Sequence, residues 1–160
     1  MDKRRFFSRL YFVLLVSLLI LPCSKDVNGE EWIRYATVGG VLRLYDAGSI
    51  KYLPNNSVRV FVKMIPEDEE ILLKMIADFR KIDPALDNFR QLNSLYEINC
   101  KDRTYKSLKM IFYDKEEQVI GKLTDEEPSV AYISPESTEE VLYKKMCEKK
   151  KRQCEGVLCW

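Results

Sequence analysis

The sequence predicts one α+β domain, an antiparallel β-sheet of about six strands with a C-terminal helix packed on one face. Three observations lead to this fold class. Short segments of alternating apolar residues recur along the chain, residues 67–82 repeat apolar residues at helical spacing, and the last periodic segment opens with helix-capping residues. With 160 residues, the chain has room for one such domain.

Residues 1–29 have the three-part layout of a secretory signal peptide. Basic residues come first, an apolar run follows over residues 10–21, and Val27 and Gly29 stand at the −3 and −1 positions of a cut before Glu30. The run is shorter than the roughly 20 apolar residues that an ordinary membrane-spanning helix needs. We therefore expect an exported chain, in the periplasm or on the outer cell surface.

Two other fates of this segment remain open. Cys23 would become the acylated N-terminus of a lipoprotein, although Pro22 stands where such signals carry a small residue. The segment would otherwise stay uncleaved as an N-terminal membrane anchor. Membrane contact is expected only through one of these two forms of the N-terminus.

The net charge argues against a general nucleic-acid binder. The whole chain has a formal charge of +1, with 26 basic and 25 acidic residues. Residues 1–29 hold five of the basic and two of the acidic residues, so the mature chain would sit near −2. A nucleic-acid-binding domain usually carries a clear excess of positive charge.

Six segments are predicted as strands, and Gly39-Gly40 is predicted as the tight turn of the first hairpin, because glycine accepts positive φ angles. The alternation is clearest in residues 58–65, where valines and Met64 face one way and polar or aromatic residues face the other. The predicted strands are 31–37, 41–45, 58–65, 95–100, 104–113 and 118–123.

Residues 67–82 are predicted as an amphipathic helix inserted between strands. The acidic residues Asp68, Glu69 and Glu70 stand in its first turn, where the helix dipole favours negative charge. Asp83-Pro84 ends the helix, because a residue before proline avoids the α region. An irregular or short helical stretch is expected from there to Asn93.

The C-terminal helix is predicted to begin near Ser134-Pro135 or at the capping box of Ser137 and Glu140. Leu142, Tyr143, Met146 and Cys147 lie on one stripe of this helix, which faces the sheet. The predicted domain covers residues 30–150, and a basic, cysteine-containing tail follows over residues 151–160.

The cysteines predict a covalent tie between the sheet and this helix. Cys100 lies on the apolar face of a predicted strand and Cys147 on the apolar stripe of the helix, so packing the helix across the sheet brings the two sulfurs within bonding reach. Two buried free thiols are the alternative, but an exported chain favours the disulfide.

Cys154 and Cys159 bracket a short loop and are predicted to form a disulfide in the tail. A zinc site built from four cysteines is the alternative, but such sites usually contain close cysteine pairs two to four residues apart. Only Cys154 and Cys159 come near that spacing.

No sequence pattern indicates an enzyme. The chain contains no histidine, which removes the commonest general base and metal ligand. No Gly-rich phosphate loop, nucleophile elbow or metal-binding motif is found. We expect no catalytic residues, no cofactor-binding residues, no metal ligands and no cofactors.

An ordered series of segments resembles the surface-adhesin protein E family of Gram-negative bacteria. The resemblance covers roughly residues 31–149. The segments are Glu31-Trp32, the Asp-x-x-Ser-Ile turn of residues 46–50, residues 58–63, residues 96–105, residues 112–114, residues 133–137, Leu142 and Cys147. The resemblance implies an antiparallel sheet with a C-terminal helix tied to it by a disulfide.

The chain departs from the family pattern at three places. Phe61 stands where the family often has tryptophan, and Glu117 stands in a turn where it often has glycine. Residues 67–93 are longer and more helical than usual, and the added helix would cover a shared binding surface if it packed there. No ligand-binding residues are carried over from the family.

The resemblance implies an exported binding module of the cell envelope with an adhesin-like activity and a protein or envelope partner. Tyr35, Tyr52 and Tyr132 are expected either as exposed aromatic contacts or as ordinary half-buried strand residues. The alternative is a structural or regulatory envelope-associated protein of unknown ligand, whose basic run over residues 144–152 contacts anionic lipid or polysaccharide. A solvated helix end is the more common interpretation of so short a run.

Overall fold

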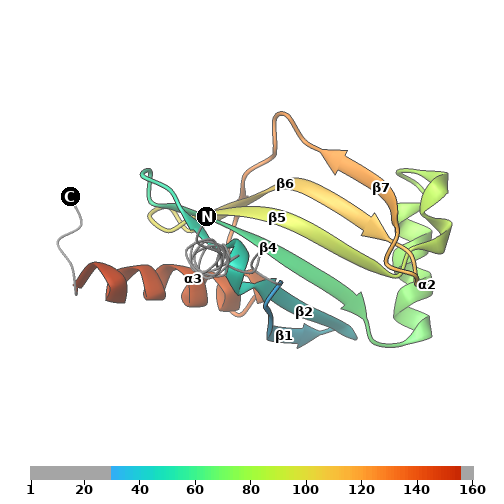
Figure 1. The fold of residues 1–160 in the computed structure, drawn as a ribbon, viewed down its shortest axis with the longest axis horizontal. Helices are drawn as coiled ribbons and strands as arrows, with labels where there is room; N and C mark the ends of the chain where they lie inside the picture. Colours follow the sequence, from blue (N-terminus) through green and yellow to red (C-terminus); the bar gives the residue numbers. More distant parts are fainter. Residues whose placement is uncertain (1–29, 156–160) are drawn as a thin grey trace, which may run out of the picture.

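The structure is a computed structural model that describes residues 30–155, with side chains up to residue 148 (Figure 1). The elements in chain order are β1 (Trp32–Val38), β2 (Val41–Asp46), the 3₁₀ turn η1 (Ala47–Ser49), β3 (Lys51–Tyr52), β4 (Ser57–Pro66), α2 (Glu69–Phe79), the 3₁₀ helix η2 (Pro84–Asn88), β5 (Gln91–Asn99), β6 (Thr104–Tyr113), β7 (Val119–Thr124), β8 (Ala131–Tyr132) and α3 (Thr138–Glu155).

The strands form one antiparallel sheet, as predicted. The main path runs β1-β2-β4-β5-β6-β7, and the two-residue strands β3 and β8 pair with β4 and β6. Helix α3 lies across one end of the sheet and α2 lies at the other end (Figure 1). The α+β architecture with a C-terminal helix and an inserted helix is confirmed.

The first hairpin turns at the two predicted glycines. Gly39 and Gly40 have φ angles of +59° and +71°, which are the two positive values of a type I′ turn. A β-carbon on Gly40 would lie 2.7 Å from Cγ1 of Ile71, so α2 packs directly on the turn. Glu117 has a φ of +59°, which accounts for the glycine that the family often has in this turn.

The predicted boundaries of α2 are too wide. Pro66 is the last residue of β4, and Asp68 caps the helix by accepting a hydrogen bond of 2.8 Å from the Ile71 N–H. The helix ends at Phe79 rather than at residue 82, and the chain then turns through hydrogen bonds to the Phe79 carbonyl. Asp68 is extended, with φ −136° and ψ 164°, so the helix cannot begin before Glu69.

The predicted start and end of the strand at residues 95–100 are wrong. Strand β5 begins at Gln91 instead of residue 95 and ends at Asn99, so Cys100 lies in the turn after the strand. Strand β6 does not alternate strictly, because Leu95 pairs with Lys109 and Tyr96 with Ser107. Leu108 is the extra residue of a β-bulge, and the bulge puts Ser107 on the same face as Met110.

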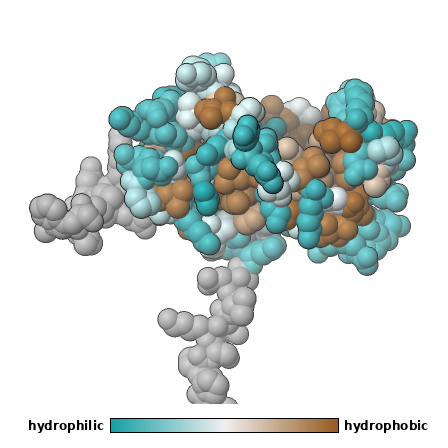
Figure 2. Space-filling model, turned by 90° about the horizontal axis from the view of Figure 1, so that it is seen from above, coloured by the Kyte–Doolittle hydropathy of each residue, from teal (hydrophilic) through white to brown (hydrophobic). Residues whose placement is uncertain are grey.

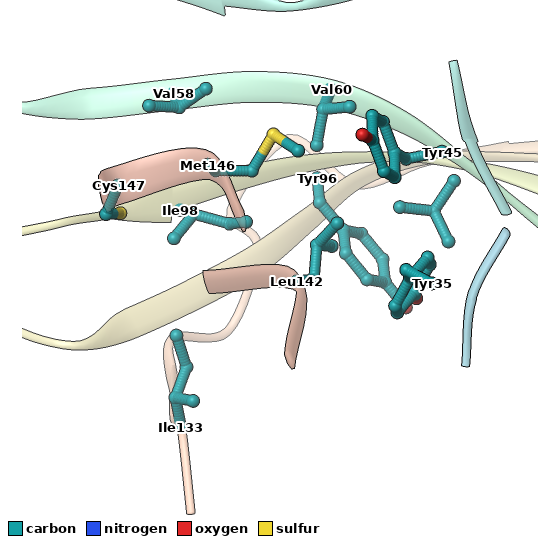
Figure 3. Packing of buried hydrophobic residues seen from close by; sticks show 11 residues of the cluster. Tyr35, Tyr45, Val58, Val60, Tyr96, Ile98, Ile133, Leu142, Met146 and Cys147 are labelled. Atoms are coloured by element: carbon teal, nitrogen blue, oxygen red, sulfur yellow. The ribbon is translucent and has the colours of Figure 1, made fainter. Parts of the chain in front are cut away.

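Both helices cover the same face of the sheet. Leu142, Met146 and Cys147 of α3 pack on Val60 and Ile98, among others, as Figure 3 shows. Leu72 and Ile76 of α2 pack with Leu86, Phe89, Leu92 and Phe112 in a second cluster. Met64 contacts both clusters, and Leu92 and Ile98 lie an even number of residues apart on β5, so the two clusters share one face.

The predicted capping box places the start of α3. The Ser137 hydroxyl accepts a hydrogen bond of 3.1 Å from the Glu140 N–H, and α3 begins at Thr138. The Glu140 carboxylate reaches back to the N–H of Glu136 at 2.9 Å instead of that of Ser137. Helix α3 continues to residue 155, which is inside the predicted tail. Within residues 30–155, no helix is both long enough and apolar enough to cross a membrane.

Candidate binding site on the open face of the sheet

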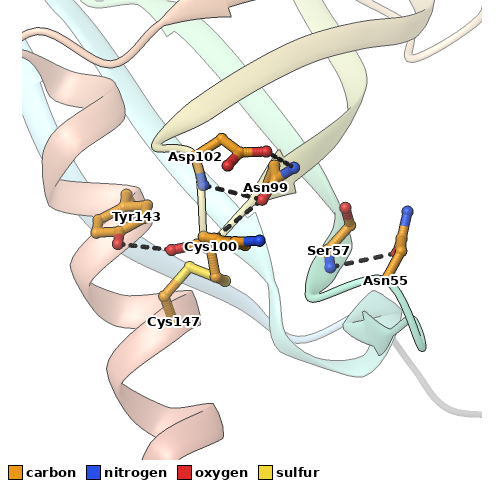
Figure 4. The surroundings of a disulfide bond; sticks show 8 residues. Asn55, Ser57, Asn99, Cys100, Asp102, Tyr143 and Cys147 are labelled. Carbon is orange, nitrogen blue, oxygen red and sulfur yellow. Dashed lines mark hydrogen bonds between the residues drawn. A yellow bond between two sulfur atoms is a disulfide. The ribbon is translucent and has the colours of Figure 1, made fainter.

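The predicted disulfide between Cys100 and Cys147 is present. The two sulfurs are 2.04 Å apart, and the bond joins the turn after β5 to the inner stripe of α3 (Figure 4). The Tyr143 hydroxyl, one turn earlier on the same helix, donates a hydrogen bond of 3.0 Å to the Cys100 carbonyl. Because both sulfurs are engaged with each other, a zinc site built from all four cysteines is ruled out.

The other cysteine predictions fall on residues that the structure does not describe. Cys23 and Cys159 lie outside residues 30–155, and the side chain of Cys154 lies beyond the described side chains. Lipidation of Cys23 and the disulfide between Cys154 and Cys159 therefore stay predictions.

The three tyrosines proposed as exposed contacts have different environments. Tyr35 is 8% exposed and packs in the α3 core, so its prediction as a surface contact is wrong. It sits at a register shift of β1, which turns its side chain inward. Tyr52 is 37% exposed and Tyr132 is 82% exposed, so both are accessible.

The face of the sheet opposite to α2 and α3, called here the open face, is covered by no helix among the described residues. Its side chains alternate along each strand with those of the core. On β4 these are Arg59, Phe61 and Lys63, and on β5 they include Leu95 and Glu97. The added helix α2 packs on the opposite face, so it does not cover this surface.

Half-buried apolar residues form the middle of the open face. Phe61 pairs with Leu95 across β4 and β5, Leu44 pairs with Lys63, and Ile111 pairs with Lys122. The set called the apolar strip consists of Trp32, Leu44, Phe61, Leu95 and Ile111, and all five are partly exposed. None of them belongs to either core cluster, so the strip is a separate apolar surface.

Basic residues surround the apolar strip. The set called the open-face cations consists of Arg34, Lys51, Arg59, Lys63, Lys106, Lys109 and Lys122. Among the described strand residues the acidic ones are Asp46, at the end of β2, and Glu97. The open face is therefore strongly basic, although acidic residues slightly outnumber basic ones over residues 30–160.

Glu97 holds two of these cations in place. Its carboxylate accepts from Arg59 at 2.7 Å and contacts Lys106 at 3.1 Å, and the residue is 8% exposed. Burial alone would raise the pKa of Glu97, but the hydrogen bonds from Arg59 and Lys106 outweigh it and hold the pKa below its ordinary value. Glu97 therefore stays ionised at neutral pH and is unsuited to act as a general base.

The lysine beside Trp32 is also fixed in place. The Lys63 ammonium lies 4.2 Å from the centre of the Trp32 ring, a cation–π geometry. The Trp32 indole donates a hydrogen bond of 2.8 Å to Glu30. An aromatic ring that carries a cation on its face joins the apolar strip to the open-face cations.

A pocket lies at one end of the open face, beyond Glu97. Its volume is about 190 Å³, and polar side chains dominate its wall. The lining residues are Asn55, Ser57, Glu97, Asn99, Thr104, Tyr105, Lys106 and Val130. Tyr132 pairs with Thr104 beside this pocket. Figure 2, which views the molecule from above, shows apolar patches separated by hydrophilic side chains.

The described residues offer groups suited to binding, namely an apolar strip surrounded by cations. They contain no cluster of three or more cysteine, aspartate or glutamate side chains that could hold a metal ion. Burial raises the pKa of Tyr35 to about 12, so its hydroxyl stays protonated near neutral pH. Side chains of the basic run over residues 144–152 are described up to residue 148. Within that part, Lys144 forms an ion pair with Glu140.

Sequence analysis did not identify the open face as a site. The signal for it was the period-2 alternation of β4, which places Arg59, Phe61 and Lys63 on one face. The matching cations of β6 and β7 are Lys106, Lys109 and Lys122, and their positions depend on the strand register. The register includes the Leu108 bulge, which the sequence pattern does not reveal.

The chain is similar to one protein family and to several solved structures. Residues 32–148 match the family described as surface-adhesin protein E. Crystal form II of Haemophilus influenzae protein E is 14% identical, with a TM-score of 0.49, and the match covers 78% of this chain and 91% of that one. Protein E from non-typeable Haemophilus influenzae is 14% identical, with a TM-score of 0.49 and coverages of 80% and 82%. No curated protein sequence matches the chain significantly.

Proposed function

The chain belongs to the surface-adhesin protein E family, and from this membership we propose that it is an exported, non-enzymatic binding module of the bacterial cell envelope that binds through its open face. The family assignment rests on residues 32–148, which include every strand and the start of α3. Family membership alone does not fix a function, so the proposal depends on the surface itself.

The observation that carries the proposal is an uncovered sheet face with an apolar strip. Sheets that pack helices on one face usually present polar residues on the other. Here Phe61, Leu95 and Ile111 remain partly exposed and outside both cores. An apolar surface rimmed by polar residues is typical of a protein interaction site.

Export is supported by the signal-like residues 1–29 and by the disulfide between Cys100 and Cys147. Disulfides form and persist in oxidising compartments such as the periplasm and the cell surface. The protein then works in the periplasm or on the outer surface, either released by cleavage before Glu30 or held by its N-terminus.

The test compares open-face variants with a matched variant on α2. The full chain is produced in an exporting host, purified from the exported fraction, and titrated against immobilised matrix proteins and envelope fractions. Phe61→Ser with Ile111→Ser removes two members of the apolar strip. Leu73→Ser changes an apolar residue on α2 that is 57% exposed and distant from the strip.

We expect the double variant to bind at least about tenfold more weakly and Leu73→Ser to bind as the parent does, because a central apolar contact contributes more than about 1 kcal/mol. Circular dichroism and the unfolding midpoint check that both variants fold. Equal binding by the parent and a folded double variant would refute the use of the open face. Saturable binding to envelope fractions alone would favour the structural or regulatory alternative over adhesion.

A further inference from the structure

We propose that the partner of the open face is an acidic protein segment with apolar side chains between its carboxylates. This inference rests on the proposed function, because it names the partner chemistry of the same face.

Charge segregation is the first argument. The open-face cations lie on five strands. Two carboxylates are found beside them: Glu97 is already bonded to Arg59 and Lys106, and Glu30 accepts the hydrogen bond from Trp32. Arg34, Lys51, Lys109 and Lys122 form no ion pair with any described residue. Other exposed carboxylates lie outside the strands, at the start of α2, in the turn at 114–117 and in the loop at 125–127. The strands of the open face therefore carry more cations than carboxylates, which favours an anionic partner.

The order of side chains across the sheet is the second argument. The strand register aligns one row of neighbouring residues across six strands. In order it consists of Arg34, Leu44, Lys63, Asn93, Ile111 and Lys122. Adjacent strands are about 4.8 Å apart, so Lys63 and Lys122 are separated by roughly 14 Å with Ile111 between them. A partner lying along this row meets cations and apolar groups in turn.

This alternation favours a protein over a polysaccharide or a lipid surface. An anionic polysaccharide would pair with the cations but has no apolar side chains to cover Leu44 and Ile111. A bilayer gains most from protruding apolar side chains that enter it. The strip residues are half-buried between longer lysine and arginine side chains, so they can receive partner side chains but cannot insert. Hydrophobic contacts with complementary charges at their edge are typical of protein interfaces.

The experiment uses the full exported chain and defined probes. A glutamate–tyrosine copolymer is compared with polyglutamate, with heparin, and with phosphatidylglycerol vesicles. The charge variant is Lys63→Glu with Lys122→Glu. The matched control, Lys74→Glu with Lys81→Glu, reverses one lysine on α2, which packs on the opposite face, and one lysine just after the end of this helix. Lys122→Glu alone, at an exposed position of β7, is included in case the double variant fails to fold.

We expect the copolymer to bind at least about tenfold more tightly than the other three probes, and its binding to weaken between about 0.05 and 0.3 M salt. The open-face charge variants should lose about tenfold in affinity and the α2 control less than about twofold. Equal or tighter binding of heparin or vesicles would overturn the inference, as would binding that ignores the open-face charges.

Failure of this inference is distinguishable from failure of the proposed function. If Phe61→Ser with Ile111→Ser abolishes binding to matrix or envelope material while the copolymer does not bind, the open face is a binding surface with a different partner chemistry. If neither the apolar nor the charge variants change any binding, both proposals are wrong.

Discussion

The Tyr143 hydroxyl donates a hydrogen bond of 3.0 Å to the carbonyl oxygen of Cys100. Tyr143 thus joins α3 to the same turn to which the disulfide from Cys147 is attached. The covalent bond and the hydrogen bond fix the helix over one end of the sheet. The opposite face is covered by no helix among the described residues.

The disulfide should be a large part of the stability of this domain. Cys100 and Cys147 are separated by 47 residues, and a loop of that length lowers the entropy of the unfolded chain by an amount equivalent to about 4 kcal/mol. Cys100→Ser with Cys147→Ser should lower the free energy of unfolding by roughly this amount, measured from urea midpoints. Cys154→Ser with Cys159→Ser, the matched control, should have a much smaller effect. Similar losses in both would contradict this role.

Removing the Tyr143 hydroxyl tests the hydrogen bond that links α3 to the turn after β5. Tyr143→Phe keeps the ring that packs against Arg103 but loses the bond to the Cys100 carbonyl. We expect a loss of about 1 kcal/mol in the free energy of unfolding. Tyr132→Phe is the control, because Tyr132 is 82% exposed, and it should leave stability unchanged. If Tyr143→Phe leaves the free energy of unfolding unchanged, the hydrogen bond contributes no net stability.

Glu97 should make stability depend on pH. Its pKa is lower in the folded protein than in the unfolded chain, so its contribution is complete above the unfolded pKa and is lost as pH falls through the folded pKa. The parent should therefore lose more stability than Glu97→Gln when pH is lowered from about 7 to about 3. Glu70→Gln, at an exposed position of α2, is the control for the loss of a surface carboxylate. If the free energy of unfolding of the parent and of Glu97→Gln changes with pH in parallel, the ion pairs of Glu97 do not contribute to stability as proposed.

The hairpin glycines provide a matched pair of substitutions. Both have positive φ, so Gly39→Ala and Gly40→Ala should each cost about 1 kcal/mol from backbone strain. Gly40→Ala should cost more, because its β-carbon would lie 2.7 Å from Ile71, whereas the space at Gly39 is open. Thermal midpoints of the two variants measure the difference. Equal midpoints would mean that α2 moves away from the turn without cost.

Local patterns account for the parts of the fold that were predicted correctly. The Val58–Met64 alternation, the Gly39-Gly40 turn and the Ser137 cap each depend on neighbours within a few residues. The Cys100–Cys147 bond was predicted from the apolar stripe of the helix and from a strand expected to include Cys100, which lies in the turn just after β5.

The start of β5 and the course of β6 could not be read in the same way. Asn93 and Ser94 are 7% and 2% exposed because strands flank β5 on both sides, so their burial reflects tertiary contacts and not their own polarity. The Leu108 bulge likewise appears only when β6 is paired with β5. Since the open face is assembled from five such registers, it was not visible before the strands were aligned.

The most direct test of the open face uses Trp32 as a reporter. The chain has two tryptophans, so Trp160→Phe leaves Trp32, on the open face beside Lys63, as the sole indole. The fluorescence of this variant is followed while a bound matrix protein, envelope extract or acidic copolymer is titrated. We expect a saturable change in Trp32 emission whose midpoint equals the independently measured Kd. Saturable binding with unchanged Trp32 emission would contradict the account.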